Sequence, residues 1–265
     1  MRRCFCRKGL GLDAGCRAVV VVMLWMFCAG CGKVHEEGSE AIDSMSMDSS
    51  KVAADVVRRR GCRSGIDVSH HQGKIDWEVV AQNLEADFVY VKATEGASYI
   101  DPRFRENIEG ASSVGYKVGV YHFFRMTSSA HDQFNNFIRA VGHYNQDVLP
   151  MVDVETRDGK RVKEVRDSLK VFIGLIKEHY GVAPMIYATN RSYNEILAPD
   201  FNAYHLYIGR YGKNAPVIKG QGHYTIWQYT ESARVKGIQK PLDMAKFHKD
   251  YDMECLLIPD HPTGS

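Results

Sequence analysis

The feature of this chain that most limits its fold is a repeated alternation of short apolar segments with amphipathic helical ones, which begins at Gly65. The short segments are apolar on both faces, which is typical of buried, parallel strands. Such alternation predicts an α/β barrel or an open, doubly wound sheet. Eight strands are expected, over residues 65–69, 88–93, 117–123, 149–155, 184–189, 205–209, 224–229 and 241–244. Eight strands favour an irregular β/α barrel with fewer helices than strands, because the later connections are short.

Helices are expected between the earlier strands, over residues 77–84, 104–114 and 130–141. The clearest helical pattern follows the fourth strand. Apolar residues recur there every three or four positions from Val162 to His179, and Gly181 provides a stop. The chain has 265 residues, which suits one large barrel domain.

The fourth strand candidate, LPMVDVE, ends in two acids one residue apart, Asp153 and Glu155. Alternate residues of a strand share a face, so both carboxylates are expected on one side. When two carboxylates lie on one side of a strand, two residues apart and partly out of water, the pKa of at least one of them is raised. Such a pair is costly on a surface and useful for acid catalysis.

Other polar residues also stand at or just past strand ends. In a barrel these ends converge on one face, where active sites are built. The set comprises Asp67, Glu95, His122, Asp153, Glu155, Gln228 and Asp243, accompanied by Tyr121, Phe123, Tyr187, Tyr207, Tyr211, Trp227 and Tyr229. Aromatic faces beside carboxylates suit sugar binding, and about half of these rings are expected to serve packing alone.

The first residues form a leader. A basic beginning precedes an apolar run over residues 18–29, which is too short for a membrane span and typical of a secretory signal. The run ends in Cys28-Ala-Gly-Cys31, which resembles a bacterial lipoprotein processing site with Cys31 as the lipidated residue. Cys28 stands where that motif usually has Leu, and a plain cleaved signal is the alternative. Lipidation would anchor the exported protein to a membrane of the cell envelope.

The net positive charge of the chain comes from this leader. The whole chain has a net charge of +2, and residues 1–31 hold five basic side chains and one acid, so the rest carries −2. A nucleic-acid partner therefore loses its main support. We divide the chain into a signal peptide (1–30), a disordered tether without aromatic residues (31–61), a catalytic barrel (62–258) and a flexible tail (259–265).

Only two cysteines follow the leader, Cys62 and Cys255, and they bracket the folded region. The first and last strands of a closed barrel are neighbours, and an exported chain meets oxidising conditions. A disulfide between the two is expected, with two unpaired thiols as the alternative.

Six ordered motifs between Gly65 and Asp243 resemble the glycoside hydrolase family 25 muramidases, the Chalaropsis-type lysozymes. The motifs are GIDVSHHQGKIDW, VKATEGASYIDPRF, VGVYHFFR, LPMVDVE, IYATNRSYNEIL and IWQYTESARVKGIQKPLD. The resemblance implies an irregular β/α barrel that cleaves the β-1,4 bond between N-acetylmuramic acid and N-acetylglucosamine in peptidoglycan. It implies no cofactor, and we expect a monomer whose partner is the glycan strand.

The resemblance also implies roles for single residues. Glu155 becomes the general acid, its pKa raised by acidic neighbours, and Asp153 stabilises the oxocarbenium-like transition state or orients the substrate's N-acetyl group. Asp67 and Asp243 position the sugar. Tyr121, Tyr187, Trp227, Glu95 and Gln228 are the expected substrate contacts.

Some positions depart from the family pattern or invite another interpretation. Tyr207 stands where the family often has Trp, and Met244 where it often has Asn. The pair His70-His71 suggests a metal site, but His71-Gln72-Gly73 is better explained as a structural turn, and no metal is expected.

Two alternatives to the muramidase stay open. One is a different barrel glycosidase, acting on chitin-like polymers. The other is a catalytically silent peptidoglycan-binding module at the envelope.

Overall fold

The structure is a computed structural model that describes residues 63–142 and 144–259. The predicted signal peptide (1–30), the whole predicted tether (31–61) with Cys31, and Cys62 lie outside the described residues. Within the described ranges, no helix combines the length and the apolar character needed to cross a membrane.

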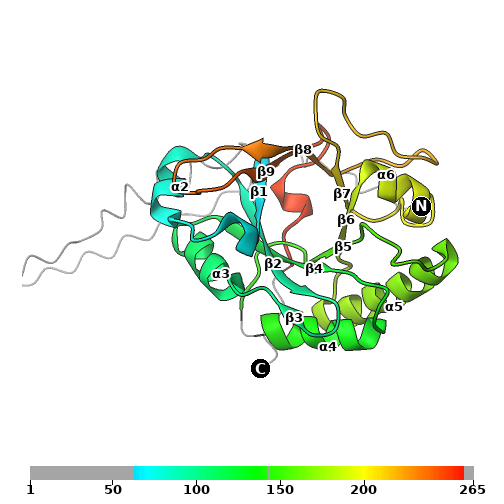
Figure 1. The fold of residues 1–265 in the computed structure, drawn as a ribbon. Coiled ribbons are helices and arrows are strands. Elements are labelled where there is room, and N and C mark those ends of the chain that lie inside the picture. The colour runs from blue at the N-terminus through cyan, green and yellow to red at the C-terminus, as the bar shows by residue number, and fades with distance from the viewer. Residues whose placement is uncertain (1–62, 143, 260–265) are drawn as a thin grey trace, which may run out of the picture. The chain divides into compact units, whose positions relative to one another are not determined.

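Eight strands form a closed barrel, whose ring is seen in Figure 1. They are β1 (Ser64–Val68), β2 (Phe88–Glu95), β4 (Lys117–Phe123), β5 (Met151–Asp153), β6 (Met185–Thr189), β7 (Leu206–Gly209), β8 (Ile226–Ala233) and β9 (Leu242–Phe247). Their order around the ring follows the chain, and β1 pairs with both β2 and β9, which closes it. A two-residue strand, β3 (Tyr99–Ile100), pairs with the end of β2. The predicted irregular eight-stranded barrel is confirmed.

The expectation that every strand is parallel was wrong for the last one. β9 runs antiparallel to both of its neighbours, β1 and β8, while the other neighbours in the ring are parallel. Only residues 234–241 connect β8 to β9. A parallel crossover needs a dozen residues or more, so this short connection forces the chain to reverse.

Four helices cover the outside of the strands at the left and bottom of Figure 1: α2 (Trp77–Asn83), α3 (Phe104–Ser113), α4 (Ala130–Val141) and α5 (Val162–Tyr180). Asp76 and Ser129 cap α2 and α4 by accepting a backbone N–H with their side chains. Gly181 ends α5 at a φ of 70°. The remaining turns are short: η1 (His70–Gln72), α6 (Asn190–Ser192), η2 (Tyr193–Leu197) and η3 (Met253–Cys255). The positions of α2, α3, α4 and α5 match the four predicted helices.

The described part of the chain has two apolar layers. The outer one lies between strands and helices and includes Val89, Leu169 and Phe172. The inner one fills the barrel, with Phe88, Tyr90, Met151, Tyr207 and Phe247 among its members. The C-terminal segment joins the inner layer at the N-terminal end of the parallel strands, where the N–H of Leu149 donates to the carbonyl of Leu256 at 2.8 Å. That end of the barrel is closed, which leaves the opposite end for a site.

We expect Gly65→Ala to lower the free energy of unfolding by about 1–3 kcal/mol through overpacking. A Cβ at Gly65 would lie 2.2 Å from Cε2 of Phe88, whose ring is fully buried at the closed end of the barrel. Urea denaturation followed by circular dichroism measures the change. Gly174→Ala is the matched control, because a Cβ there meets nothing within 4 Å and alanine favours the helix by about 1 kcal/mol. Equal stability of wild type and Gly65→Ala would contradict the packing argument.

Candidate active site

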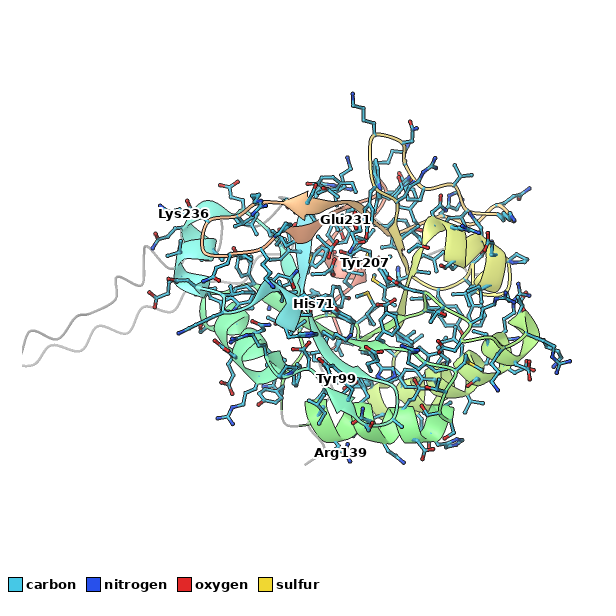
Figure 2. The ribbon with its side chains drawn as sticks, in the orientation of Figure 1. His71, Tyr99, Arg139, Tyr207, Glu231 and Lys236 are labelled. Atoms are coloured by element: carbon cyan, nitrogen blue, oxygen red, sulfur yellow. The ribbon has the colours of Figure 1, made fainter. Side chains whose placement is uncertain are left out.

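Polar side chains form the layer of the barrel interior next to its open end. Alternate residues of a strand share a face, so Lys92 follows Phe88 and Tyr90 on the inner face of β2, and Asp67 follows Gly65 on β1. The same layer holds Tyr121, Asp153, Tyr187, Gln228 and Asp243. In Figure 2, Tyr207 projects near the centre of the ring of strands, with His71, Tyr99 and Glu231 around it in this view.

Asp153 and Glu155 stand where β5 ends. Asp153 is the last residue of the strand, in register with Phe123 and Tyr187, and only 6% of its surface is exposed. Its Oδ1 is buried without a hydrogen-bond partner among the described residues. Glu155 follows just past the strand, where its carbonyl accepts a hydrogen bond from Oγ of Ser192 at 2.9 Å.

Both members of this pair hold their protons more tightly than free acids do. Burial, and next the charge of Glu155, raise the pKa of Asp153 well above its usual value. Burial also raises the pKa of Glu155, against the opposing effects of Lys92 and the Tyr187 hydroxyl. The expectation that acidic neighbours raise the pKa of Glu155 was therefore wrong about the cause, which is loss of water contact. The pair retains a proton at a pH where exposed carboxyls have lost theirs.

Lys92 brings a positive charge into this acidic layer. It was not among the site residues predicted from the sequence. Its side chain is 9% exposed, and its Nζ lies 2.8 Å from Oε2 of Glu95 and 5.0 Å from the ring centre of Phe123. The Lys92 charge opposes the rise in the pKa of Asp153 and of Glu155. Lys92 therefore limits the rise in the pKa of both acids.

A second set of hydrogen bonds fixes Asp67. The Tyr207 hydroxyl donates to Oδ2 of Asp67 at 2.5 Å, and Nε2 of Gln228 donates to the same atom at 3.0 Å. The Gln228 amide is oriented in turn by the hydroxyls of Tyr187 and Tyr211, which donate to its Oε1 at 2.8 and 3.2 Å. Oδ1 of Asp67 is buried without a partner among the described residues.

Asp243 reaches the same layer from the antiparallel strand. It lies at the beginning of β9, not at a strand end as expected, and the reversed direction of β9 puts it in register with Asp67. Burial and the charge of Asp243 raise the pKa of Asp67 to about 7, against the hydrogen bonds from Tyr207 and Gln228. Burial, with the charges of Glu231 and Glu155, raises the pKa of Asp243 to about 6. The charge of Asp243 thus acts on Asp67, and the charge of Glu155 acts on both Asp153 and Asp243, at one end of the barrel.

The raised pKa of Asp67 predicts a pH-dependent stability. The folded protein holds this proton up to about pH 7 and the unfolded chain loses it near 3.8, so the stability contributed is complete below 3.8 and is lost as the pH rises through 7. We expect Asp67→Asn to remove this loss, which amounts to at most about 4 kcal/mol. Urea denaturation of both proteins at pH 4, 5.5 and 7.5 measures it. Parallel pH profiles for the two proteins would contradict the prediction.

Not every residue expected to contact substrate faces the open end. Trp227 precedes Gln228 on β8 and therefore lies on the opposite face of that strand. Its indole N–H donates to the carbonyl of Arg210 at 2.7 Å, and Nζ of Lys246 lies 4.6 Å from its ring centre. Trp227 is thus placed to hold the loop that follows β7.

Glu95 stands at the end of β2 in an ion-pair network. Its carboxylate lies 2.8 Å from Lys92 and 2.9 Å from Arg125, and these cations lower the pKa of Glu95 although burial opposes them. This arrangement anchors Lys92. Tyr121, in contrast, lies on β4 near the acids, and burial together with the charges of Asp153 and Asp67 raises its pKa.

His122 and Gln72 have structural roles. His122 is buried, its ring nitrogens within hydrogen-bonding distance of Thr94 and Gln133 at 2.8 and 3.0 Å. Burial lowers the pKa of His122 to about 4. The side chain of Gln72 accepts from the N–H of Ser69 at 2.8 Å and donates to the carbonyl of Pro241 at 3.2 Å, which fits the structural explanation of the His71-Gln72-Gly73 turn.

Among the described residues no group of three or more His, Cys, Asp or Glu side chains is arranged to hold a metal ion. Sγ of Cys255 lies 2.9 Å from the carbonyl of Asp252. Because Cys62 is outside the described residues, the disulfide stays a prediction.

Comparison with known proteins agrees with this geometry. The family model for "Glycosyl hydrolases family 25" matches residues 66–238. Lysozyme M1 from Streptomyces globisporus is 32% identical over 202 residues, covering 69% of this chain and 67% of its own length, and uncharacterized protein YegX from Escherichia coli (strain K12) is 32% identical over 188 residues, covering 69% of each.

Among solved structures, the bacterial lysozyme from Streptomyces coelicolor superimposes with a TM-score of 0.65 at 32% identity, covering 70% of this chain and 91% of the other. The family model spans most of the barrel and includes Asp67, Asp153 and Glu155. The chain is therefore a glycoside hydrolase that belongs to glycosyl hydrolase family 25.

Proposed function

We propose that this protein is an N-acetylmuramidase, a lysozyme that hydrolyses the β-1,4 bond between N-acetylmuramic acid and N-acetylglucosamine in peptidoglycan. The observation that carries the proposal is the buried pair of Asp153 and Glu155, which retains a proton at the open end of a family 25 barrel. A relative named lysozyme that is 32% identical over 202 residues supports the same activity. Acid catalysis of glycosidic cleavage needs such a pair.

In this proposal Glu155 is the general acid. It donates its proton to the bridging oxygen as the bond to the anomeric carbon breaks, so that the leaving sugar departs as an alcohol. The carbonyl oxygen of the substrate's own N-acetyl group then forms the bond to the anomeric carbon. Glu155, now a carboxylate, removes a proton from the water that displaces this oxygen, which gives net retention.

Asp153 supports the step by holding the N-acetyl group. Its buried Oδ1, which has no partner in the described chain, is available to accept the amide N–H of that group. With the proton of the pair on Glu155, the carboxylate of Asp153 also stabilises positive charge near the anomeric carbon. Asp67, which Tyr207 and Gln228 hold in place, and Asp243 bind sugar hydroxyls beside it.

The experiment that tests the function identifies the bond that is cut. Purified peptidoglycan is digested with residues 61–265, and the new reducing ends are reduced with borohydride and identified by mass spectrometry. Reduced muramic acid ends support the muramidase. Reduced glucosamine ends would mean that the other linkage is cut, cleavage of chitin instead would favour another glycosidase, and wall binding without cleavage would favour the silent module.

We further propose that the protein acts outside the cytoplasm, in the cell envelope. The signal-like leader and the cell-wall substrate support export, and Cys28-Ala-Gly-Cys31 supports lipid anchoring through Cys31. Metabolic labelling with a clickable palmitate analogue, with Cys31→Ala as the control, tests the anchor. A monomer is proposed as the working unit, and light scattering of the soluble barrel tests it.

A further inference from the structure

A pocket lies beside the four acids, where β6 and β7 end. It has a volume of about 560 Å³, and its wall includes Asn190, Asn194, Arg210, Tyr211 and Lys219. The catalytic proposal above uses none of these five side chains except Tyr211, which orients Gln228.

Two short chains of hydrogen bonds connect this pocket to the acids. Oγ1 of Thr189, at the pocket wall, donates to Oγ of Ser192 at 2.9 Å, and Ser192 donates to the carbonyl of Glu155 at 2.9 Å. On the other side, Tyr211 contacts Gln228, which contacts Asp67. The charges of Asp243 and Glu155 contribute to the raised pKa of Tyr211. The pocket and the catalytic site therefore share a wall.

The loop that forms the pocket is held in place by specific bonds. Nδ2 of Asn190 and Nδ2 of Asn194 both donate to the carbonyl of Val217, at 2.9 and 2.7 Å. Oδ1 of Asn194 accepts the N–H of Lys219 at 2.8 Å. Trp227 holds the beginning of the loop through the carbonyl of Arg210. The pocket is thus formed before any ligand binds, which lowers the entropic cost of binding.

The pocket has a positive charge, in contrast to the acids beside it. Residues 210–220 contain Arg210, Lys213 and Lys219 and no Asp or Glu. In the described ranges neither Arg210 nor Lys219 forms an ion pair, whereas Arg191 at the rim pairs with Glu195 at 2.9 Å. The guanidinium of Arg210 donates to the carbonyl of Ala215 at 2.8 Å through Nη1, which leaves its other N–H groups for an anion.

We propose that this pocket binds a carboxylate of the peptide stem carried by the muramic acid whose bond is cleaved. The inference rests on the proposed muramidase function. Cleavage that leaves muramic acid at the new reducing end requires this sugar to lie directly beside the acids. Its lactyl-linked peptide therefore begins within one sugar's width of them. The stem's carboxylates are repelled by the four acids and attracted by Arg210 and Lys219, and a guanidinium can bind a carboxylate through two parallel bonds.

The test compares two substrates that differ only in stem charge. Soluble, uncrosslinked glycan chains with their peptide stems are treated with carbodiimide and methylamine, which converts each carboxylate into a neutral N-methyl amide. We expect the wild-type kcat/KM to fall about tenfold on the neutral substrate. The double variant Arg210→Gln/Lys219→Gln should lose about tenfold on the native substrate, match wild type on the neutral one, and show less dependence on added salt.

Lys213→Gln is the matched control, because Lys213 belongs to the same loop but not to the pocket wall, and it should behave as wild type. Equal wild-type turnover of both substrates would overturn the inference and leave the muramidase standing. So would a double variant that is weakened equally on both, because its defect would then be structural. Failure of the wild type to cleave either substrate would instead overturn the proposed function, and this inference with it.

Discussion

Glu155→Gln should lower kcat/KM on peptidoglycan by about a thousandfold or more while the protein folds normally. A general acid contributes roughly 10²–10⁴ to the rate, and glutamine has nearly the same shape as glutamate but no proton to donate. The carboxyl of Glu155 is penalised by burial when it is charged, so the neutral amide should be tolerated without loss of stability. Release of reduced muramic acid ends measures the activity, and thermal unfolding measures the stability.

The matched control for this variant is Glu231→Gln. Glu231 is an exposed carboxyl near the site, whose charge contributes to the raised pKa of Asp243. Its removal should change activity by no more than a few-fold. If Glu155→Gln turned over like the wild type, Glu155 would not be the acid, and the protonated group would have to be sought among the other three carboxyls.

Asp153→Asn should lower kcat by about a hundredfold or more with little change in KM. The amide occupies the same buried space, but it supplies no negative charge at the anomeric carbon. The charge that is no longer stabilised is the positive charge that the N-acetyl group gains when its oxygen attacks the anomeric carbon. The side-chain oxygen of the Asp153→Asn variant can still accept the N-acetyl N–H, so binding of the ground state should survive. Steady-state kinetics on soluble glycan chains separates the two parameters.

A second substrate tests the particular role that we assign to Asp153. De-N-acetylated glycan has no acetyl oxygen to form the intermediate bond, so the wild type should cleave it slowly and Asp153→Asn should be impaired no further. A variant with unchanged kcat and a raised KM would show that Asp153 only binds substrate. An equal loss on both glycans would assign it a purely electrostatic role.

The positions of strands and helices could be predicted from the sequence because they depend on local patterns. Apolar runs mark each barrel strand, and the spacing from Val162 to His179 with Gly181 defines α5. The direction of β9 depends instead on the length of a connection. Residues 234–241 are too few for a crossover, and this signal was present in the sequence.

In the candidate site, too, some features follow from local patterns and others depend on the folded chain. All four acids could be found by residue type, although Asp243 lies at the beginning of its strand and not at the end. Trp227 and Gln228 are adjacent, so alternation forbids both from pointing inward, and counting from Gln228 would have assigned Trp227 to the outer face. Lys92 stands two residues after Tyr90 in an apolar run, which places it inward, but only the folded chain shows its contacts with Glu95 and Phe123.

The antiparallel β9 has a consequence for when this protein becomes active. β9 is the last strand in the described part of the chain, and it both closes the barrel against β1 and carries Asp243 to its place opposite Asp67. A chain still being synthesised or threaded through a membrane lacks this strand, so its barrel is open and its set of acids is incomplete. A wall-cutting enzyme built in this order acquires Asp243 only after all the other barrel strands have emerged, so the timing of its activity is set by the order of its strands.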